Sequence, residues 1–132
     1  MKTLEDSIAW QKSRILVNAI YQSFYKIGDW IFYKQIYRAA LSTMNNIAEG
    51  LERNSNKELL YFLNVSKGSC GEVRSMLYVA KDQNKITQED FWKLFNQSKE
   101  LSKVLSGFMK SINAKACRAT LKFLLPTFNF PL

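Results

Sequence analysis

Apolar residues recur along this chain at steps of three and four, the spacing of positions on one face of an α-helix. The row between residues 56 and 82 consists of Leu59, Leu63, Ser66, Cys70, Val73, Leu77 and Ala80. The row between residues 88 and 112 consists of Phe91, Phe95, Ser98, Leu101, Leu105, Phe108 and Ile112. Few segments show the strict alternation of a β-strand, so the pattern predicts an all-α protein.

Helix ends are marked by capping residues and by polar breaks. Ser55 precedes Glu58 by three residues, and Thr87 precedes Asp90 by three, so each pair can satisfy free backbone N–H groups at a helix start. With breaks near residues 27–29, 53–55 and 82–85, we predict helices over about 5–27, 30–53, 56–82 and 88–112. Four long helices with short connections favour an antiparallel up-and-down four-helix bundle over residues 1–112.

Residues 113–132 form a C-terminal tail that we assign to the same domain. The tail contains both prolines of the chain and the basic residues Lys115, Arg118 and Lys122, which precede the apolar segment 123–125. We expect it either to extend the fourth helix and then fold back, or to form an apolar arm that docks on a neighbouring subunit. Its hydrophobicity argues against free disorder.

The first two predicted helices carry more apolar residues than a core-facing stripe needs. In the first, Trp10, Val17 and Tyr21 widen the core row of Leu16, Ile20, Phe24 and Ile27 to an arc of about 140°, against roughly 100° for a surface helix. In the second, Tyr33, Tyr37, Met44 and Leu51 lie beside the core row of Phe32, Ile36, Ala39, Thr43, Ile47 and Gly50. The surplus fits either a subunit interface or two helices that each pack between two neighbours.

The composition describes one basic domain. The chain has 132 residues and a formal net charge of +8, which favours phosphate-rich or acidic partners without indicating a fold. Because no apolar run is long enough to span a membrane and the N-terminal segment lacks a signal-peptide pattern, we expect a cytoplasmic protein without a membrane partner. Cys70 and Cys117 are then expected to be unpaired.

The chain contains no histidine, which excludes Ser-His and Cys-His nucleophile pairs and histidine metal ligands. Phosphate-cradling glycine loops and zinc-type cysteine spacing are also missing from the sequence, so we predict a non-enzyme without metal or cofactor. Gly68-Ser69-Cys70-Gly71 is the nearest feature. We interpret Cys70 as a core residue and the glycines as a place where another backbone comes close, with a reactive thiol as the alternative.

Basic residues form two rows. Lys67, Arg74 and Lys81 repeat every seven residues along one flank of the third helix, whereas Glu58 and Glu72 occupy the other flank. The second row, on the fourth helix, contains Lys99, Lys103 and Lys110 with Trp92 in line. Cations that take phosphates beside a ring that can stack on a base are typical of a nucleic-acid surface, although lysines also keep a helix face solvated.

Several short motifs carry a family resemblance. They are Trp10-Gln11-Lys12, Arg38-Ala39-Ala40, Ser42, Asn46-Ile47-Ala48-Glu49-Gly50, Arg53, Phe62-Leu63, Gly68-Ser69 and Glu72. Over residues 7–110 the chain therefore resembles the four-helix-bundle family of 23S rRNA intervening-sequence proteins, which includes the accessory variability proteins of diversity-generating retroelements. The resemblance implies ring-shaped homopentamers. For the accessory proteins it also implies binding of nucleic acid and of a reverse transcriptase through basic surface.

We interpret these motif residues as structural. Glu49 and Arg53 have the spacing of an ion pair on one helix, Arg38 can pair with Glu72 across a helix interface, and Asn46 can bond a backbone group.

Taken together, the basic rows, the surplus apolar faces and the resemblance predict a non-catalytic homo-oligomer that binds RNA or DNA, with a nucleic-acid enzyme as a further partner. The alternative is a protein-interaction scaffold that binds no nucleic acid.

Overall fold

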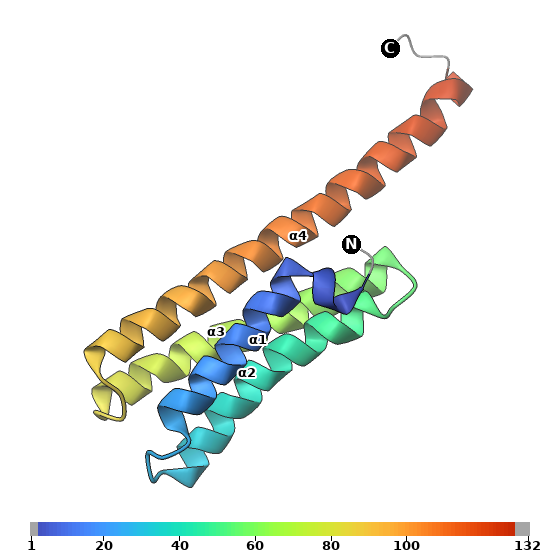
Figure 1. The fold of residues 1–132 in the computed structure, drawn as a ribbon. Coiled ribbons are helices and arrows are strands. Elements are labelled where there is room, and N and C mark those ends of the chain that lie inside the picture. The colour runs from blue at the N-terminus through green and yellow to red at the C-terminus, as the bar shows by residue number, and fades with distance from the viewer. Residues whose placement is uncertain (1–2, 129–132) are drawn as a thin grey trace.

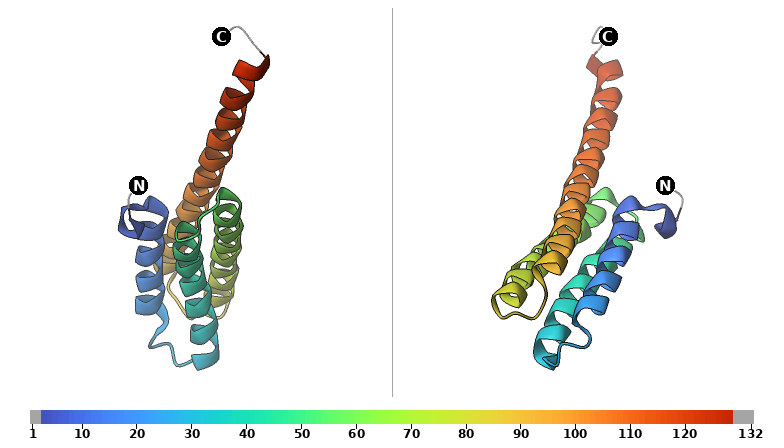
Figure 2. Two further views of the ribbon diagram at one scale, coloured as in Figure 1. Left: turned by 90° about the vertical axis from the view of Figure 1, so that its right-hand side faces the viewer. Right: turned by 60° about the vertical axis from the view of Figure 1, so that its left-hand side comes forward.

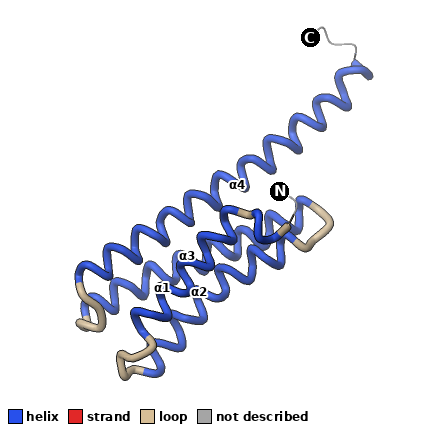
Figure 3. The backbone as a smooth tube through the Cα atoms, in the orientation of Figure 1, coloured by secondary structure: helices blue, strands red, loops and turns tan. Residues whose placement is uncertain are grey.

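The computed structural model describes residues 3–128, and within them every regular element is a helix (Figures 1 and 3). A short 3-10 helix, η1 (Leu4–Asp6), precedes α1 (Ile8–Phe24), α2 (Trp30–Leu51), α3 (Asn56–Asp82) and α4 (Gln88–Phe128). The all-α prediction is therefore confirmed.

The four α-helices pack as an up-and-down bundle. Consecutive helices run antiparallel (Figure 2), and α1 contacts α2 and α4 while α3 contacts α2 and α4. Each helix thus lies between two neighbours, which is the arrangement predicted from four long helices and short connections.

Each of the four α-helices begins at a side-chain cap. The Ser55 hydroxyl accepts a hydrogen bond from the N–H of Glu58 at 3.2 Å, and the Thr87 hydroxyl accepts one from the N–H of Asp90 at 3.1 Å, as predicted. Ser7 and Asp29 cap α1 and α2 in the same way. Because Ser7 caps α1 and Gly28 turns the chain with a φ of +82°, α1 is shorter than the predicted 5–27.

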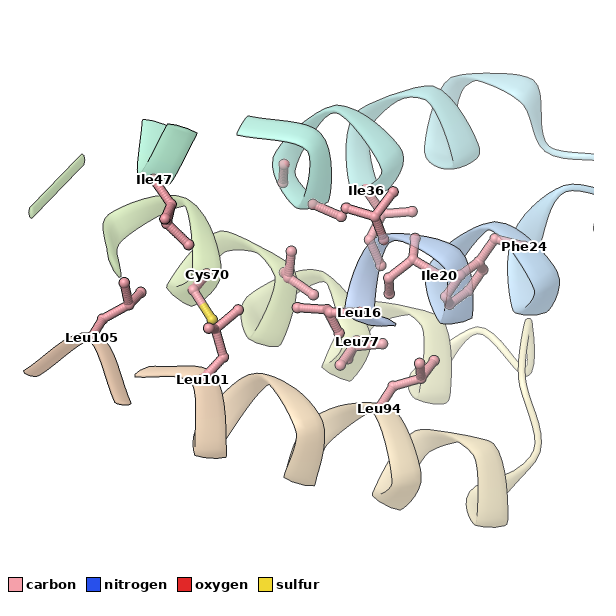
Figure 4. Close-up of a cluster of buried hydrophobic side chains, with 14 of the residues drawn as sticks. Leu16, Ile20, Phe24, Ile36, Ile47, Cys70, Leu77, Leu94, Leu101 and Leu105 are labelled. Carbon is pink, nitrogen blue, oxygen red and sulfur yellow. The ribbon is translucent and has the colours of Figure 1, made fainter. Parts of the chain in front are cut away.

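The core lies where the apolar periodicity puts it (Figure 4). The predicted core row of α2 is buried throughout, and in α3 only Leu59 remains partly exposed. In α4, Phe95 and Phe108 are half-buried, whereas Leu94, which lies beside the predicted row, is fully buried. A helix between two neighbours buries a stripe wider than a single row, and Leu94 lies on that wider stripe.

Part of the surplus apolar surface of α1 and α2 is covered within the bundle. Val17 is buried, and Trp10, Tyr33 and Tyr37 are half-buried against the core. Packing between two neighbours therefore accounts for these positions. Tyr21 remains exposed, together with other aromatic residues described below.

The fourth helix continues well past the bundle. Ile112 is the last buried residue among those whose side chains the structure describes, and the side chains of residues 113–121 are all exposed. Residues 113–128, here called the α4 extension, prolong α4 as a helix that projects beyond the bundle (Figure 1). The tail thus extends the fourth helix, and it does not fold back within these residues. Its remaining residues, 129–132, lie outside the described part of the chain.

Candidate functional site

A groove between α3 and α4 collects most of the predicted basic residues. It encloses about 740 Å³, and no acidic residue lines it. Five of its lining residues are cations: Lys67, Arg74, Lys99, Lys103 and Lys110. We call this feature the basic groove.

The groove follows from helix geometry and from packing. Lys67 and Arg74 are seven residues apart, so they share one flank of α3, and Lys103 and Lys110 share one flank of α4 for the same reason. Packing of α3 against α4 turns these two flanks toward each other. The two rows that the sequence predicts separately are therefore one surface.

Lys81 and Trp92 were predicted with these rows but do not line the groove. They lie beside each other where α3 ends and α4 begins. The Lys81 ammonium is 5.6 Å from the centre of the Trp92 ring and 4.8 Å from that of Phe91. Trp92 is 45% exposed, so part of its ring is accessible to solvent.

Two aromatic residues of the groove were missed by the sequence analysis. Tyr78 and Phe95 line it and meet edge to face with their ring centres 5.7 Å apart. The Lys99 ammonium lies 5.9 Å from the centre of the Phe95 ring. Tyr78 follows Arg74 by four residues, so helical spacing from the basic row was the signal that could have found it.

Arg74 is anchored more firmly than the lysines. Its guanidinium donates to the carbonyl oxygen of Ser98 at 3.5 Å and to the sulfur of Cys70 at 3.7 Å. Cys70 is itself fully buried and donates to the same Ser98 carbonyl at 3.1 Å. Burial raises the pKa of the Cys70 thiol, although the nearby Arg74 charge acts in the opposite direction. A raised pKa disfavours the thiolate, which supports Cys70 as a core residue.

The motif residues on α2 mostly hold α2 to α3. Arg53, two residues past the end of α2, pairs with Glu49, as predicted, and also lies 3.9 Å from Glu58 and 5.0 Å from the centre of the Phe62 ring. Ser42 and Ser69 share a hydrogen bond of 2.8 Å between the two helices.

Asn46 donates to the backbone carbonyl of Ser42 at 2.8 Å, which is the kind of bond predicted for it. Gly50 permits the close approach of α3, since a Cβ added there would lie 3.0 Å from the Cβ of Phe62 and 3.3 Å from the Leu59 carbonyl oxygen. These contacts fit the structural interpretation of the motif.

Two expectations about the motif are not met among residues 3–128. Arg38 and Glu72 are both exposed, and no ion pair joins them among residues 3–128. Within the described residues no other backbone lies close to Gly68, because a Cβ added there would meet nothing within 4 Å. Both Gly68 and Glu72 are exposed on α3, and among the described residues neither has a hydrogen-bond or ion-pair partner from another helix.

An aromatic cluster covers the outer side of α1 and α2. It consists of Tyr21, Tyr25, Trp30, Tyr33 and Tyr37. Tyr21 stacks on Tyr25 with ring centres 4.7 Å apart, and Tyr33 stacks on Tyr37 at 5.4 Å. Desolvation raises the pKa of Tyr33, and the neighbouring tyrosines add to the effect. Trp30, at 68% exposure, is the most accessible ring of the cluster.

The described residues meet neither the requirements of a metal site nor those of a membrane-spanning helix. Residues 3–128 bring together no group of three or more Cys, Asp or Glu side chains that could hold a metal ion. Across the same residues, no helix combines the length and apolar character needed to cross a membrane. Cys70 and Cys117 are both free thiols.

The fold and the groove define a small helical-bundle protein with one strongly basic face. The family model of the 23S rRNA-intervening sequence protein matches residues 5–107, and the chain belongs to this family. No curated protein matches the chain.

A similar solved structure is a protein with unknown function from the S23 ribosomal protein family of Bacteroides thetaiotaomicron. It aligns with a TM-score of 0.74 and 24% sequence identity, over 78% of this chain and 99% of that chain. At this identity the likeness supports the shared fold.

Proposed function

We propose that this protein is a non-catalytic homo-oligomer that binds the phosphate backbone of RNA or DNA in the basic groove. The observation that carries the proposal is the gathering of five cations in one groove without an acidic residue. Neutralising phosphates releases condensed counterions, which favours association in proportion to the number of contacts. The net charge of +8 adds long-range attraction for the same partners.

The groove also offers surfaces for bases. Tyr78 is 48% exposed along it, and Trp92 lies exposed beside Lys81. Rings of this kind stack on unpaired bases without selecting a sequence. We therefore propose single-stranded or looped nucleic acid as the preferred form, bound with little sequence preference.

The test is a titration of a fluorescent single-stranded RNA against salt, using the Lys67→Gln/Lys103→Gln double variant. Each phosphate contact contributes about 0.7 to the slope of log affinity against log salt for a single strand. Losing two contacts should lower the slope by about 1.4 and weaken binding at least tenfold at low salt.

The matched control is Lys57→Gln/Lys93→Gln, which removes the same charge from exposed positions outside the groove. It should keep nearly the full slope. Equal losses in both variants would show that only net charge matters, and no binding by the native chain at low salt would remove the nucleic-acid proposal altogether.

We also propose that copies assemble into a closed ring, as the family resemblance implies, with five subunits. The exposed aromatic cluster and the unequal charge on the two flanks of α3 support association between copies. A ring would repeat the basic groove around its surface and multiply its contacts with one nucleic-acid chain. Native mass spectrometry at micromolar concentration measures the subunit number, and a monomer would contradict the ring.

Within a cell, such a ring would act as an adaptor that presents nucleic acid to an enzyme, for which a reverse transcriptase is the partner implied by the resemblance. The two free cysteines fit a reducing cytoplasm. The missing histidine supports a role without catalysis.

A protein-interaction scaffold is the second candidate function. The aromatic cluster favours it, because stacked, partly exposed tyrosines and a tryptophan are typical of the centre of a protein interface. One comparison distinguishes nucleic-acid binding from a scaffold function. Trp30→Ala should leave RNA affinity unchanged if the groove binds nucleic acid, whereas a scaffold would show no RNA affinity in either form.

A further inference from the structure

The outward face of α3 carries an exposed stripe at heptad spacing. The stripe consists of Tyr61, Val65, Gly68, Glu72, Ser75 and Val79, all of which are exposed. It lies away from the basic groove. Tyr61 is 63% exposed and Val79 is 39% exposed, so apolar side chains at both ends of the stripe are in contact with solvent in the isolated chain.

Gly68 is the least explained residue of this stripe. A glycine inside a helix disfavours the helix by about 1 kcal/mol relative to alanine. Within the chain nothing requires it, since a Cβ at position 68 would have no neighbour within 4 Å. A glycine on an exposed helix face leaves room for the close approach of a second helix, which at this position would belong to another molecule.

The α4 extension is a second exposed feature, since the described side chains of residues 113–121 all contact solvent. Its residues Ala114, Cys117 and Leu121 are exposed, and the sequence continues the same spacing of three and four at Leu124 and Phe128. The extension projects from the end of its own bundle (Figure 1), so as a continuous helix it cannot reach the outer face of its own α3. The alignment with the solved relative uses 78% of this chain and 99% of that chain, and the family match ends at residue 107. The α4 extension therefore lies outside the family match.

The two features fit each other in charge and in length. No acidic residue follows Glu100, and the extension carries Lys115, Arg118 and Lys122. All three acids of α3, Glu58, Glu72 and Asp82, lie on or beside the outward stripe. Lys57 precedes the stripe at the same spacing and Glu58 also lies 3.9 Å from Arg53, so Glu72 and Asp82 are the acids that remain for the extension. The extension spans about 24 Å and the stripe about 28 Å at 1.5 Å per residue. By contrast, the hollow beside the aromatic cluster is lined by Lys34 and Arg38 and by no acid.

We propose that the α4 extension of one copy docks on the outward stripe of α3 of the next copy. The contact is head to tail, because the two surfaces differ, and such contacts close into rings when the rotation permits. The inference rests on the self-association in the proposed function and names the surfaces that produce it. It leaves the basic groove facing solvent.

Disulfide trapping in the full chain tests the contact. Ser75→Cys places a thiol on the stripe, and the native Cys117 supplies the exposed thiol of the extension. Diamide oxidation should link most chains into covalent ladders, and peptide mapping should find the introduced thiol bonded to Cys117. The control Gln22→Cys puts a thiol on an exposed position of α1 and should give at least tenfold less linkage.

Three results would overturn the proposal. They are equal linkage in the Ser75→Cys and Gln22→Cys variants, ladders that persist when Ser75→Cys is combined with Cys117→Ser, and bonds only between two Cys117 residues. The last outcome would show that extensions pair with each other.

A second variant tests the close approach without removing the extension. Gly68→Gln fills space that is open within the chain, so the fold should remain, as judged by circular dichroism. Association should weaken at least tenfold in native mass spectrometry. Ser111→Gln, at an exposed position of α4, is the control and should associate normally.

Failure of this proposal is distinguishable from failure of the proposed function. If Gly68→Gln leaves the subunit number and the association constant unchanged, the docking contact is wrong while assembly stands. If the native chain is monomeric, assembly and docking both fail. RNA binding by the basic groove is measured separately, through the lysine variants described above.

Discussion

Gly50 and Gly107 show how differently the same residue type can behave in this protein. Both lie within helices, where glycine has an intrinsic cost. A Cβ at Gly50 would press on Phe62 and on the Leu59 backbone, whereas a Cβ at Gly107 would meet nothing within 4 Å. Helix propensity alone treats the two positions alike, and only the packing of α2 against α3 separates them.

We predict that Gly50→Ala destabilises the protein by about 1–3 kcal/mol, the range for overpacking a well-packed interface. The backbone of α3 would have to move, because the contact includes the Leu59 carbonyl oxygen. Urea unfolding followed by circular dichroism measures the change.

Gly107→Ala is the matched comparison. It should stabilise the protein by up to about 1 kcal/mol through helix propensity. The prediction for Gly50 is wrong if the two substitutions shift the unfolding midpoint in the same direction.

At the scale of elements, Asp29 joins two turns that are far apart in the sequence. Its carboxylate caps α2 by accepting from the N–H of Phe32 at 3.0 Å, and it pairs with Lys85 of the α3–α4 connection at 2.9 Å. The backbone hydrogen bond, followed by the one from Lys85, holds the pKa of Asp29 below its ordinary value of 3.8. The same contact ties the two turns at this end of the bundle.

The lowered pKa of Asp29 determines how the stability of the protein changes with pH. A lowered pKa in the folded state means that the contribution of Asp29 is present above the ordinary carboxyl pKa and is lost as pH falls through the lowered one. Asp29→Asn should therefore lower the melting temperature at pH 7, and the gap to the native protein should close under acid conditions. Asparagine is still able to cap a helix, so the gap reports mainly the pair with Lys85.

The check is a series of thermal melts from neutral to acid pH. Lys85→Gln should show a gap with the same pH dependence, because it removes the other partner of the pair. A gap that stays constant down to the lowest pH would contradict the assignment.

At the scale of the whole molecule, the basic surface is longer than the groove. Lys81 and Trp92 prolong it toward the α3–α4 connection, whereas Trp30 lies in the aromatic cluster on α1 and α2. If nucleic acid binds along the groove, its path extends to Trp92 and does not reach Trp30. The fluorescence of Trp92 and Trp30 can therefore report where a ligand binds.

We predict that single-stranded RNA quenches the emission of a variant with Trp92 as its sole tryptophan, Trp10→Phe/Trp30→Phe, by roughly 20% or more through stacking. The matched variant Trp10→Phe/Trp92→Phe keeps Trp30 and should change little. Fluorescence titration at low salt measures both. Stronger quenching of Trp30 would move the binding surface to the aromatic cluster.

Most of the fold was predictable from the sequence because it depends on local signals. The caps at Ser55 and Thr87 placed the starts of α3 and α4 correctly, and the apolar rows identified most buried residues. Ser7 was not recognised as a cap, so α1 was predicted too long. A serine caps a helix only when the chain turns there, and the sequence around Ser7 shows no break.

The candidate site was predicted only in part. Lys67, Arg74, Lys99, Lys103 and Lys110 were identified as two separate rows, and the pair proposed between Arg38 and Glu72 does not form among the described residues. Tyr78 and Phe95 were assigned no role in a site. Each of these points depends on which flank of one helix faces which flank of another.

The sequence by itself determined that this protein is a basic, histidine-free bundle of four helices, because helical periodicity, capping and charge are properties of neighbouring residues. The tertiary structure decided that two basic rows form one groove, that position 50 has no room for a Cβ and that the α4 extension projects beyond the bundle (Figure 1). These features arise from contacts, or from their absence, between residues far apart in the chain, and no local pattern specifies them.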